Sequence, residues 1–577
     1  MGSRWSKLVL ISLMSWMLAA PSFAASAPVT GRVTADVILY NGKVMTVDSR
    51  FTVAQAVAIT GDRFLAAGKN QEVLALARPA TRRIDLRGKT VVPGFVDAHN
   101  HIDSIGWSRI HFAGSRSIAD VVKVVADEVG KKKPGEWVIS GRAGGAPGPE
   151  KLPAILKERR NPNRWELDSV SPDNPVWLYA PHVSIVNSYL LKLAGIDKNT
   201  ADPSGGTIGR DPKTGEPTGV LTERAIRLIS KIAPKPTYQD MLSAVQKAVR
   251  HYHSKGITSV KAEGVSEDGL RALMELREKG QLTLRVSASL KAPDLGLPTK
   301  EIETWLKSYE ATIASRRGVG DELLRIEGAG EFGIDGGTGS GSAFQRFQYV
   351  GAAGKRSFGD QKVTQEKFTE VSLLCAKYNF RMNIHASGGA AVDLTLNGWE
   401  EVNRQIPIGG LRWNLIHAQA PSKINYEQIK RLGATVVTDP VKMTSTVVGY
   451  YGKEFSETLN PLREWLDHGV RIALGSDAEV GAPDPLLWIY MASTRSLIDG
   501  TQLGLNQKIT PKEALIASTI NGSYVTFEEK KKGSIEAGKL ADLVVLDRDL
   551  LSVPANEIKE IKVLVTMVAG KVVYETK

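Results

Sequence analysis

Short apolar runs alternate with amphipathic segments through the middle of this chain. Between several of the apolar runs, apolar residues recur at helical spacing, as in TYQDMLSAVQKAVRHYHSK and TQEKFTEVSLLCAKY. Strands that alternate with helices are typical of a parallel α/β fold, and eight of them predict a (β/α)8 barrel of the TIM type. The predicted core strands are VVPGFVDAH, GITSVKAE, LRVSASL, LLRIEGAGE, RMNIHAS, RWNLIHA, ATVVTDP and RIALGSD.

The two ends of the chain show a different pattern. Short runs of alternating apolar and polar residues are broken by Asn-Gly and Gly-Asp pairs, which favour hairpins. This pattern covers residues 31–90 and returns over residues 526–577. We therefore expect a composite β-sandwich domain formed from both chain termini. The barrel then spans residues 91–525, and its stretch 105–250 is too long for one crossover, which predicts an inserted subdomain.

The first 24 residues have the order of a secretory signal peptide. Arg4 and Lys7 precede an apolar run that ends at Ala20, and the small-residue stretch up to Ala24 resembles a cleavage site. The alternative is a single membrane anchor, for which the run is short. The sequence predicts cleavage after Ala24, no stable membrane span after that cleavage, and a periplasmic or secreted mature protein.

Composition narrows the class of protein further. Apolar residues make up 42% of the chain and charged residues 24%, which is ordinary for a soluble globular protein. The formal net charge is +12, but Lys and Arg are spread along the chain and form no nucleic-acid-binding signature, so no nucleic-acid partner is expected. Cys375 is the only cysteine, which excludes an intrachain disulfide. A homo-oligomer stays open.

The placement of the histidines is the strongest chemical signal. Residues two apart on a strand point to the same side, so His99 and His101 in DAHNHI can meet one ion. His385, His417 and Asp477 each stand at the end of another predicted strand. Active sites of such barrels form at the C-terminal ends of the strands. Four imidazoles and a carboxylate there predict a site for zinc or a similar divalent metal.

A histidine at a strand end is by itself more often a hydrogen-bonding residue of the core or surface. The chain supplies its own contrast in His251 and His253, which lie two apart on a predicted helix and so point roughly 200° apart, given about 3.6 residues per turn. We interpret these two as surface or capping residues. The strand-borne set differs because its members occupy equivalent ends of three predicted strands.

The sequence resembles the amidohydrolase superfamily, and within it the YtcJ-like amidohydrolases, which are related to N-acyl-D-amino-acid deacylases and N-substituted formamide deformylases. The resemblance covers nearly the whole mature chain. It implies the same barrel with a composite β-sandwich. The segments that carry it are PGFVDAHNHI, HVSIVNSYLLKLAGI, GEPTGVL at 215–221, IHASGGAAVD, LIHAQ, ALGSD, ITPKEAL and KGSIEAGKLADLVVLD.

Two positions depart from the pattern of this family. Glu331 stands four residues before Asp335-Gly336, where the family commonly has a lysine that is often carboxylated and bridges two metals. We hypothesise that Glu331 is a metal ligand, against the alternative of an ion pair at the barrel rim. The usual Gly-Asp-Arg after the fifth-strand histidine is Gly388-Gly389-Ala390 here, which puts the family's typical substrate contacts in doubt.

Weaker candidates complete the predicted site. The resemblance implies that His182 and Asn187, in HVSIVNS, contact substrate, although a lone histidine beside a strand is as often structural. Lys261 and Glu263 end the second strand, where they either face the pocket or form an internal ion pair.

These observations predict a metal-dependent amidohydrolase that cleaves a C–N bond (an amide, N-acyl, N-formyl or cyclic amide) of a small molecule through a metal-activated water. One or two ions, most simply zinc, are expected: His99, His101 and Asp477 hold one position, His385 and His417 the other, and Glu331 lies between them. Asp477 is the candidate catalytic base. The alternatives are a metal-dependent esterase or lactonase, and a non-catalytic secreted metal-binding or regulatory relative.

Overall fold

Eight parallel strands form a nearly closed barrel at the centre of the protein. The computed structural model describes residues 34–104, 110, 112, 114–140, 149–313, 319–478 and 480–576, so the predicted signal peptide at residues 1–24 lies outside the described residues. Each barrel strand pairs in parallel with the next one along the chain. The strands are β8 (Phe95–Asn100), β14 (Ile257–Val265), β15 (Arg285–Lys291), β17 (Leu324–Gly333), β20 (Met382–Ala386), β21 (Asn414–His417), β22 (Thr435–Thr438) and β23 (Ile472–Leu474).

Polar contacts bring the first and last barrel strands together. A parallel bridge joins Asn100 to Ala478, just beyond β23. The buried Asp97 carboxylate accepts hydrogen bonds from the Ser476 backbone N–H at 2.9 Å and from the Ser476 hydroxyl at 2.6 Å. These bonds fix the end of β8 against the segment after β23, which confirms the predicted barrel.

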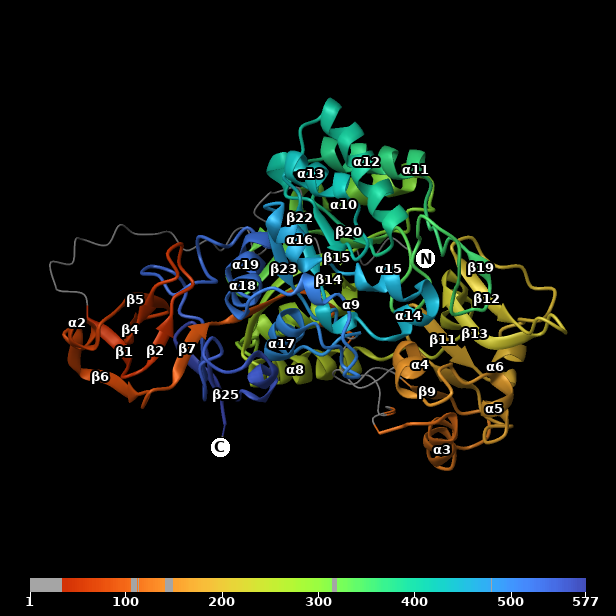
Figure 1. Ribbon diagram of the computed structural model, residues 1–577, viewed down its shortest axis with the longest axis horizontal. Coiled ribbons are helices and arrows are strands. Elements are labelled where there is room, and N and C mark those ends of the chain that lie inside the picture. Colours follow the sequence, from red (N-terminus) through yellow and green to blue (C-terminus); the bar gives the residue numbers. More distant parts are fainter. Residues whose placement is uncertain are drawn as a thin grey trace.

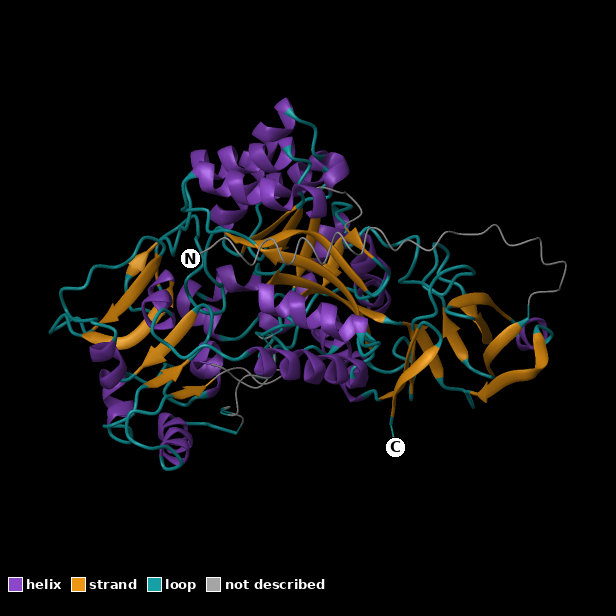
Figure 2. Cartoon of the chain, turned by 180° about the vertical axis from the view of Figure 1, so that it is seen from behind, coloured by secondary structure: helices purple, strands orange, loops and turns teal. Residues whose placement is uncertain are grey.

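Amphipathic helices cover the outside of the barrel, as Figure 2 shows from behind. In α8 (Tyr238–Ser254) the Thr237 side chain caps the N-terminus, and the apolar residues from Met241 to Tyr252 face the core. His253 is buried in the same helix, with Nε2 2.9 Å from the Thr283 hydroxyl. Of the two interpretations given for it, a surface or a capping residue, the first is therefore wrong. The other helices of the cover are α9 (Glu267–Glu278), α10 (Thr299–Ile313), α11 (Gln365–Lys377), α12 (Gly389–Gln405), α13 (Lys423–Leu432), α16 (Leu462–Asp467), α17 (Pro485–Thr494), α18 (Pro511–Ala517) and α19 (Ile520–Val525).

The segment VVPGFVDAH is not one strand, as the sequence predicted, but two. Its first part is β7 (Thr90–Pro93), which belongs to a different sheet from β8. The two strands meet at Gly94, where a Cβ would lie 2.1 Å from the Thr258 hydroxyl oxygen. Only glycine therefore lets the chain pass β14 closely enough to turn from one sheet into the other.

Strands from both ends of the chain form two packed sheets beside the barrel. In the first sheet β24 (Leu543–Leu546) pairs antiparallel with β7, so the C-terminal segment completes a sheet begun near the N-terminus. An apolar layer that includes Leu39, Phe64 and Met567 lies between the two sheets. The remaining strands are β2 (Lys43–Met45), β3 (Val53–Ala54), β25 (Val563–Val568) and β26 (Lys571–Glu575) in the first sheet, and β1 (Ala35–Tyr40), β4 (Ala56–Thr60), β5 (Arg63–Gly68) and β6 (Ala77–Asp85) in the second.

A third sheet belongs to the segment between β8 and α8, where the sequence predicted an insertion. Its strand order is β12-β13-β11-β10-β9, and it carries its own apolar clusters. The helices and strands are α3 (Ile118–Val129), β9 (Val138–Ser140), α4 (Leu152–Ile155), α5 (Arg164–Asp168), β10 (Val176–Leu178), β11 (Val183–Val186), α6 (Ser188–Leu193), β12 (Gly206–Arg210), β13 (Pro217–Glu223) and α7 (Arg227–Ser230). We call this segment, residues 112–230, the inserted subdomain.

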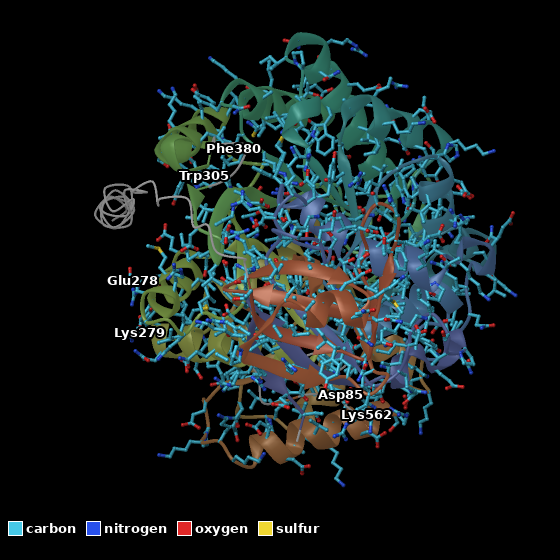
Figure 3. The ribbon with its side chains drawn as sticks, turned by 90° about the vertical axis from the view of Figure 1, so that its left-hand side faces the viewer. Asp85, Glu278, Lys279, Trp305, Phe380 and Lys562 are labelled. Carbon is cyan, nitrogen blue, oxygen red and sulfur yellow. The ribbon has the colours of Figure 1, made fainter. Side chains whose placement is uncertain are left out.

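The three parts lie in a row, with the paired sheets at one end, the barrel in the middle and the inserted subdomain at the other end (Figure 1). Figure 3 looks onto the end formed by the paired sheets, near Asp85 and Lys562. In the same view Trp305 of α10 lies beside Phe380, with ring centroids 5.9 Å apart. Among the described residues no helix has the length and apolar character needed to span a membrane.

Candidate metal centre

The histidine pair of β8 faces the carboxylate that follows β23. His99 Nε2 lies 3.4 Å from Asp477 Oδ1, and His101 Nε2 lies 3.2 Å from the same oxygen. The strand alternation that places two residues on one side explains why both imidazoles reach one atom. The contacts of Asp97 with Ser476 hold the two strand ends at this separation.

Glu331 of β17 lies between this pair and the other two strand-end histidines. Its Oε1 is 3.0 Å from His385 Nδ1, 3.2 Å from His417 Nε2 and 3.7 Å from His99 Nε2. Its Oε2 is 3.7 Å from His101 Nε2. One carboxylate thus contacts four imidazoles that come from β8, β20, β21 and the residue just after β8.

Neighbouring acceptors fix the orientation of three of these rings. His101 Nδ1 lies 3.0 Å from the Glu263 carbonyl oxygen, and His385 Nε2 lies 3.3 Å from the Gly336 carbonyl oxygen. His417 Nδ1 lies 2.6 Å from Asp439 Oδ2. An acceptor on one ring nitrogen leaves the other nitrogen free to donate its lone pair, which is the usual arrangement of metal-binding histidines.

The residues present fit a bound divalent cation. Both ring nitrogens of His99 are buried and lack a hydrogen-bond partner among the described residues, which is costly for a polar group unless something else binds it. Ligand atoms of His99, His101 and Glu331 lie within 4.8 Å of one another, and so do those of Glu331, His385 and His417. Imidazole nitrogen and carboxylate oxygen suit zinc and similar ions.

The charges and the burial of the centre keep Glu331 and Asp477 ionised and His385 neutral. Burial would raise the pKa of Glu331, but His99 and His385 outweigh it and hold that pKa well below its ordinary value. Burial likewise opposes ionisation of Asp477, yet the Lys442 ammonium and His99 hold its pKa well below the usual range. Burial lowers the pKa of His385 to about 4. Anionic carboxylates and a neutral imidazole are the protonation states that bind metals.

Two residues at the centre were not found from the sequence. Lys442 Nζ lies 2.5 Å from Asp477 Oδ2 and 3.3 Å from His417 Nε2, and Asp439 binds the far side of His417. Asp439 is the last residue but one of the predicted strand ATVVTDP, so its place near a strand end was a usable signal. Lys442 follows on a short 3₁₀ turn (Pro440–Lys442), where no periodicity indicates which way a side chain points.

His182 lies at the edge of the centre. Its ring centroid is 5.2 Å from that of His385, and its Nδ1 lies 2.8 Å from Glu223 Oε1. Both His182 and Glu223 belong to the inserted subdomain. The structure therefore brings His182 beside the strand-end histidines, in a position to contact a substrate.

Asn187 lies elsewhere, and its prediction as a substrate contact is corrected. It is fully buried, and its amide nitrogen donates to the carbonyl oxygens of Ser171 and Asn174. Its Oδ1 accepts from the backbone N–H groups of Val176 and Leu190, the second of which caps α6. All of its polar atoms serve the inserted subdomain, so none is left for a substrate.

The Gly388-Gly389 departure has a steric reason. A Cβ at Gly389 would lie 2.9 Å from the Ala420 carbonyl oxygen, a backbone atom that cannot easily move aside, and 2.3 Å from Arg346 Nη1. Arg346 is itself held by Asp393, with bonds of 2.6 and 2.7 Å. The space beside Gly389 is thus occupied by an arginine from a loop and not by a side chain that follows His385.

Lys261 and Glu263 form an internal ion pair and not a pocket wall. Both are fully buried, and Lys261 Nζ contacts Glu263 Oε1 and lies 3.6 Å from Glu327 Oε1. Arg381 Nη1 lies 3.0 Å from the same Glu327 oxygen. We call these four residues the inner-barrel network.

Comparison with known proteins agrees with this geometry. The model of the amidohydrolase family matches residues 82–574. The chain is 31% identical to N-substituted formamide deformylase of Arthrobacter pascens, over 94% of this chain and 98% of that protein. It is 27% identical to the putative amidohydrolase YtcJ of Bacillus subtilis, over 86% and 91%. A solved structure of a metal-dependent hydrolase from Pyrococcus furiosus aligns with 89% of this chain and 100% of that one, at 25% identity and a TM-score of 0.64.

The fold and the centre define a metal-dependent hydrolase. The chain belongs to the amidohydrolase family, in agreement with the resemblance to YtcJ-like members. It is thus an enzyme that hydrolyses a carbon–nitrogen bond other than a peptide bond.

Proposed function

We propose that this amidohydrolase cleaves the amide bond of a small N-substituted carboxamide, with N-substituted formamides as the first candidates. The observation that carries the proposal is the convergence of His99, His101, His385, His417, Glu331 and Asp477 at one end of the barrel. The substrate class is suggested by the formamide deformylase relative, whose similarity extends over nearly its whole length.

The metal in this proposal is zinc, as one or two ions. His99, His101 and Asp477 would hold one position, His385 and His417 the second, and Glu331 would be shared between them. A bound divalent cation supplies a nucleophile at neutral pH, by lowering the pKa of water, and polarises the carbonyl group. The lysine that the family commonly has at this position must first react with carbon dioxide to gain a carboxylate, whereas Glu331 already carries one.

Asp477 is the proposed base, and Lys442 is its partner. The Lys442 ammonium at 2.5 Å from Oδ2 keeps the carboxylate ionised, as a base must be before it accepts the proton of the attacking water. The same ammonium favours release of that proton afterwards, which makes protonated Asp477 an effective donor to the leaving nitrogen. His182 is proposed to contact the substrate from the side of the inserted subdomain.

Metal analysis and a substrate panel test the proposal together. Purified protein loaded with zinc should hold one or two ions per chain and hydrolyse N-substituted formamides faster than matched formate esters or lactones. Asp477→Asn should lower kcat by about 10²- to 10⁴-fold. Full kcat in this variant would remove Asp477 from the mechanism. Faster ester or lactone turnover would favour an esterase, and bound metal without any turnover would favour the non-catalytic alternative.

We further propose that the protein is exported, on the strength of the signal-like order of residues 1–24. Expression of the full chain in a bacterium, followed by fractionation and N-terminal sequencing, tests this. A periplasmic or secreted product that begins at Ala25 is expected. Full-length protein retained in the cytoplasm would contradict export.

A further inference from the structure

The inserted subdomain supplies a histidine–carboxylate pair to the edge of the metal centre. Glu223 is the last residue of β13, and His182 directly precedes β11, the strand that pairs with it. His182 Nδ1 lies 2.8 Å from Glu223 Oε1, and the His182 ring lies 5.2 Å from that of His385. None of the steps assigned to Glu331, Asp477 and Lys442 uses this pair.

The surroundings of Glu223 determine which nitrogen of His182 carries a hydrogen. Lys362 Nζ lies 2.7 Å from Glu223 Oε2, and the Ser342 hydroxyl donates to Oε1 at 2.8 Å. Burial opposes its ionisation, but Lys362 and His182 hold the pKa of Glu223 far below its ordinary value. An ionised carboxylate only accepts hydrogen bonds, so Nδ1 must be the donor. In the neutral ring Nε2 is then an acceptor.

The backbone holds this pair under strain. Glu223 has φ +47° and ψ −120°, a conformation that side chains other than glycine rarely adopt, and it is only 6% exposed. Strained residues of this kind cluster at functional sites, where the surrounding structure keeps a side chain in place. A Cβ on Gly336 would lie 2.5 Å from Glu223 Oε1, so the loop after β17 also needs a glycine to admit the carboxylate.

The acceptor nitrogen of His182 is unused within the described part of the chain, where only Nδ1 has a hydrogen-bond partner. The carbon edge of the ring packs on the loop after β17, since a Cβ on Gly337 would lie 3.2 Å from His182 Cδ2. The Nε2 atom is on the part of the ring that faces away from Glu223. The His182 side chain is 13% exposed and that of Glu223 only 2%, so the histidine is the accessible member of the pair at the rim of the centre.

We propose that His182 is a specificity-determining residue whose Nε2 accepts a hydrogen bond from the N–H of the scissile amide, and that Glu223 positions it by fixing its tautomer. The inference rests on the proposed amide hydrolysis and names the feature of the substrate that is recognised. A secondary amide has the N–H that this acceptor requires. A tertiary amide and an ester do not, and they leave Nε2 without a partner when they bind.

Three matched substrates test the proposal with zinc-loaded protein: an N-alkylformamide, its N-methylated derivative and the corresponding formate ester. His182→Asn keeps a donor toward Glu223 but lacks an atom at the position of Nε2. It should lower kcat/KM for the N–H substrate by about tenfold or more and change the other two substrates by about threefold or less. Glu223→Gln should give the same selective loss, because a glutamine amide permits the tautomer in which Nε2 is a donor.

Two controls separate this role from a structural one. His468→Asn changes a histidine outside the centre, 41% exposed, and should leave the ratio among the three substrates at the wild-type value. His182→Gln restores a polar atom near the position of Nε2 and should recover part of the preference for the N–H substrate. An equal loss on all three substrates in His182→Asn, or an unchanged ratio in both His182→Asn and Glu223→Gln, would overturn the proposal.

Binding provides a readout that does not depend on turnover. In the Asp477→Asn background the N-alkylformamide should bind about tenfold or more tightly than its N-methylated derivative, and the added His182→Asn change should remove that difference. Retention of the difference would overturn the role of His182 while the proposed amide hydrolysis stands. Failure of wild-type protein to hydrolyse any of the three substrates, with metal bound, would overturn the proposed function and this inference with it.

Discussion

Two buried ionic clusters lie within the same barrel, and their charges are balanced in different ways. The inner-barrel network pairs the cations Lys261 and Arg381 with the carboxylates Glu263 and Glu327, so it contains its own counter-ions. The centre at the strand ends has the carboxylates Glu331, Asp477 and Asp439 around four imidazoles, with Lys442 as the cation paired with them. A buried network without surplus charge needs no ion, whereas surplus acceptors favour one.

The comparison shows that the same barrel strand can carry stabilising charged side chains and also contribute to the candidate metal centre at its end. Lys261 and Glu263 lie two residues apart on β14, and the Glu263 carbonyl oxygen is the acceptor for His101 at the strand end. One strand thus contributes both to the network that supports the site and to the site itself. The first three changes below are expected to affect one cluster and leave the other unaltered, and the last two concern the inserted subdomain and the residues around Glu223.

The largest effect is expected from Glu331→Gln. Removal of the shared carboxylate should reduce the bound metal per chain and lower kcat/KM by about 10³-fold or more, because the activated nucleophile depends on the metal. Metal content measured by elemental analysis and steady-state kinetics provide the readout. Glu263→Gln is the matched control in the other cluster and should retain the metal. Unchanged metal content and activity in Glu331→Gln would refute its role as a ligand.

Lys261→Met should act on stability and not on metal content. Removal of one partner leaves Glu263 and Glu327 buried with Arg381 alone, which should lower the free energy of unfolding by about 3–5 kcal/mol. Denaturant unfolding of the metal-loaded protein measures it. The double change Lys261→Met with Glu263→Met removes both charges and should recover much of the loss. A loss below about 1 kcal/mol in the single variant would contradict a tightly coupled buried pair.

Metal removal should lower the stability of the protein, and this loss should arise at the centre at the strand ends and not at the inner-barrel network. A ligand present at about 1,000 times its Kd stabilises the folded state by about 4 kcal/mol, so chelation should lower Tm and added zinc should restore it. Lys261→Met should show the same difference between metal-free and metal-loaded protein as the wild type. Equal Tm values with and without metal in the wild type would mean that the ion does not bind the folded centre.

Asp360 tests the charged cluster around Glu223, since it binds the hydroxyls of Thr207 and Thr222 close to that carboxylate. Burial and Glu223 raise its pKa to about 6, above the ordinary value near 3.8. Its favourable contribution to folding is therefore complete below about pH 4 and is lost as pH rises through 6. Asp360→Asn should make the free energy of unfolding depend less on pH between 4 and 6, by about 1–2 kcal/mol over that interval. An unchanged pH dependence would contradict the raised pKa.

The smallest effect on the enzyme is expected from Asn187→Ala. Loss of its cap on α6 and of its bonds to Ser171 and Asn174 should lower stability by about 1–2 kcal/mol. Because no polar atom of Asn187 faces the centre, kcat/KM of the folded protein should stay within about twofold of wild type. A selective rise in KM without loss of stability would restore Asn187 as a substrate contact.

The sequence by itself determined the barrel and the residues at its strand ends. The two-residue alternation of a strand places His99 and His101 on one side, and the parallel topology brings His385, His417 and Asp477 to the same edge. Both rules depend only on local periodicity and on the order of strands, and the sequence alone provides both. The sheet formed by both termini was predicted because both show the same pattern of short alternating runs. The turn at Gly94 was not predicted, because it depends on the close approach of Thr258.

Only the tertiary structure decided which side chains surround those strand ends. Lys442 contacts Asp477 from a turn. Glu223 contacts His182, 41 residues earlier in the chain. Asn187 lies only five residues from His182 but points into the interior of the inserted subdomain. The directions of these side chains depend on loop conformation and on packing between distant segments. No periodicity in the sequence encodes them, because a loop has none.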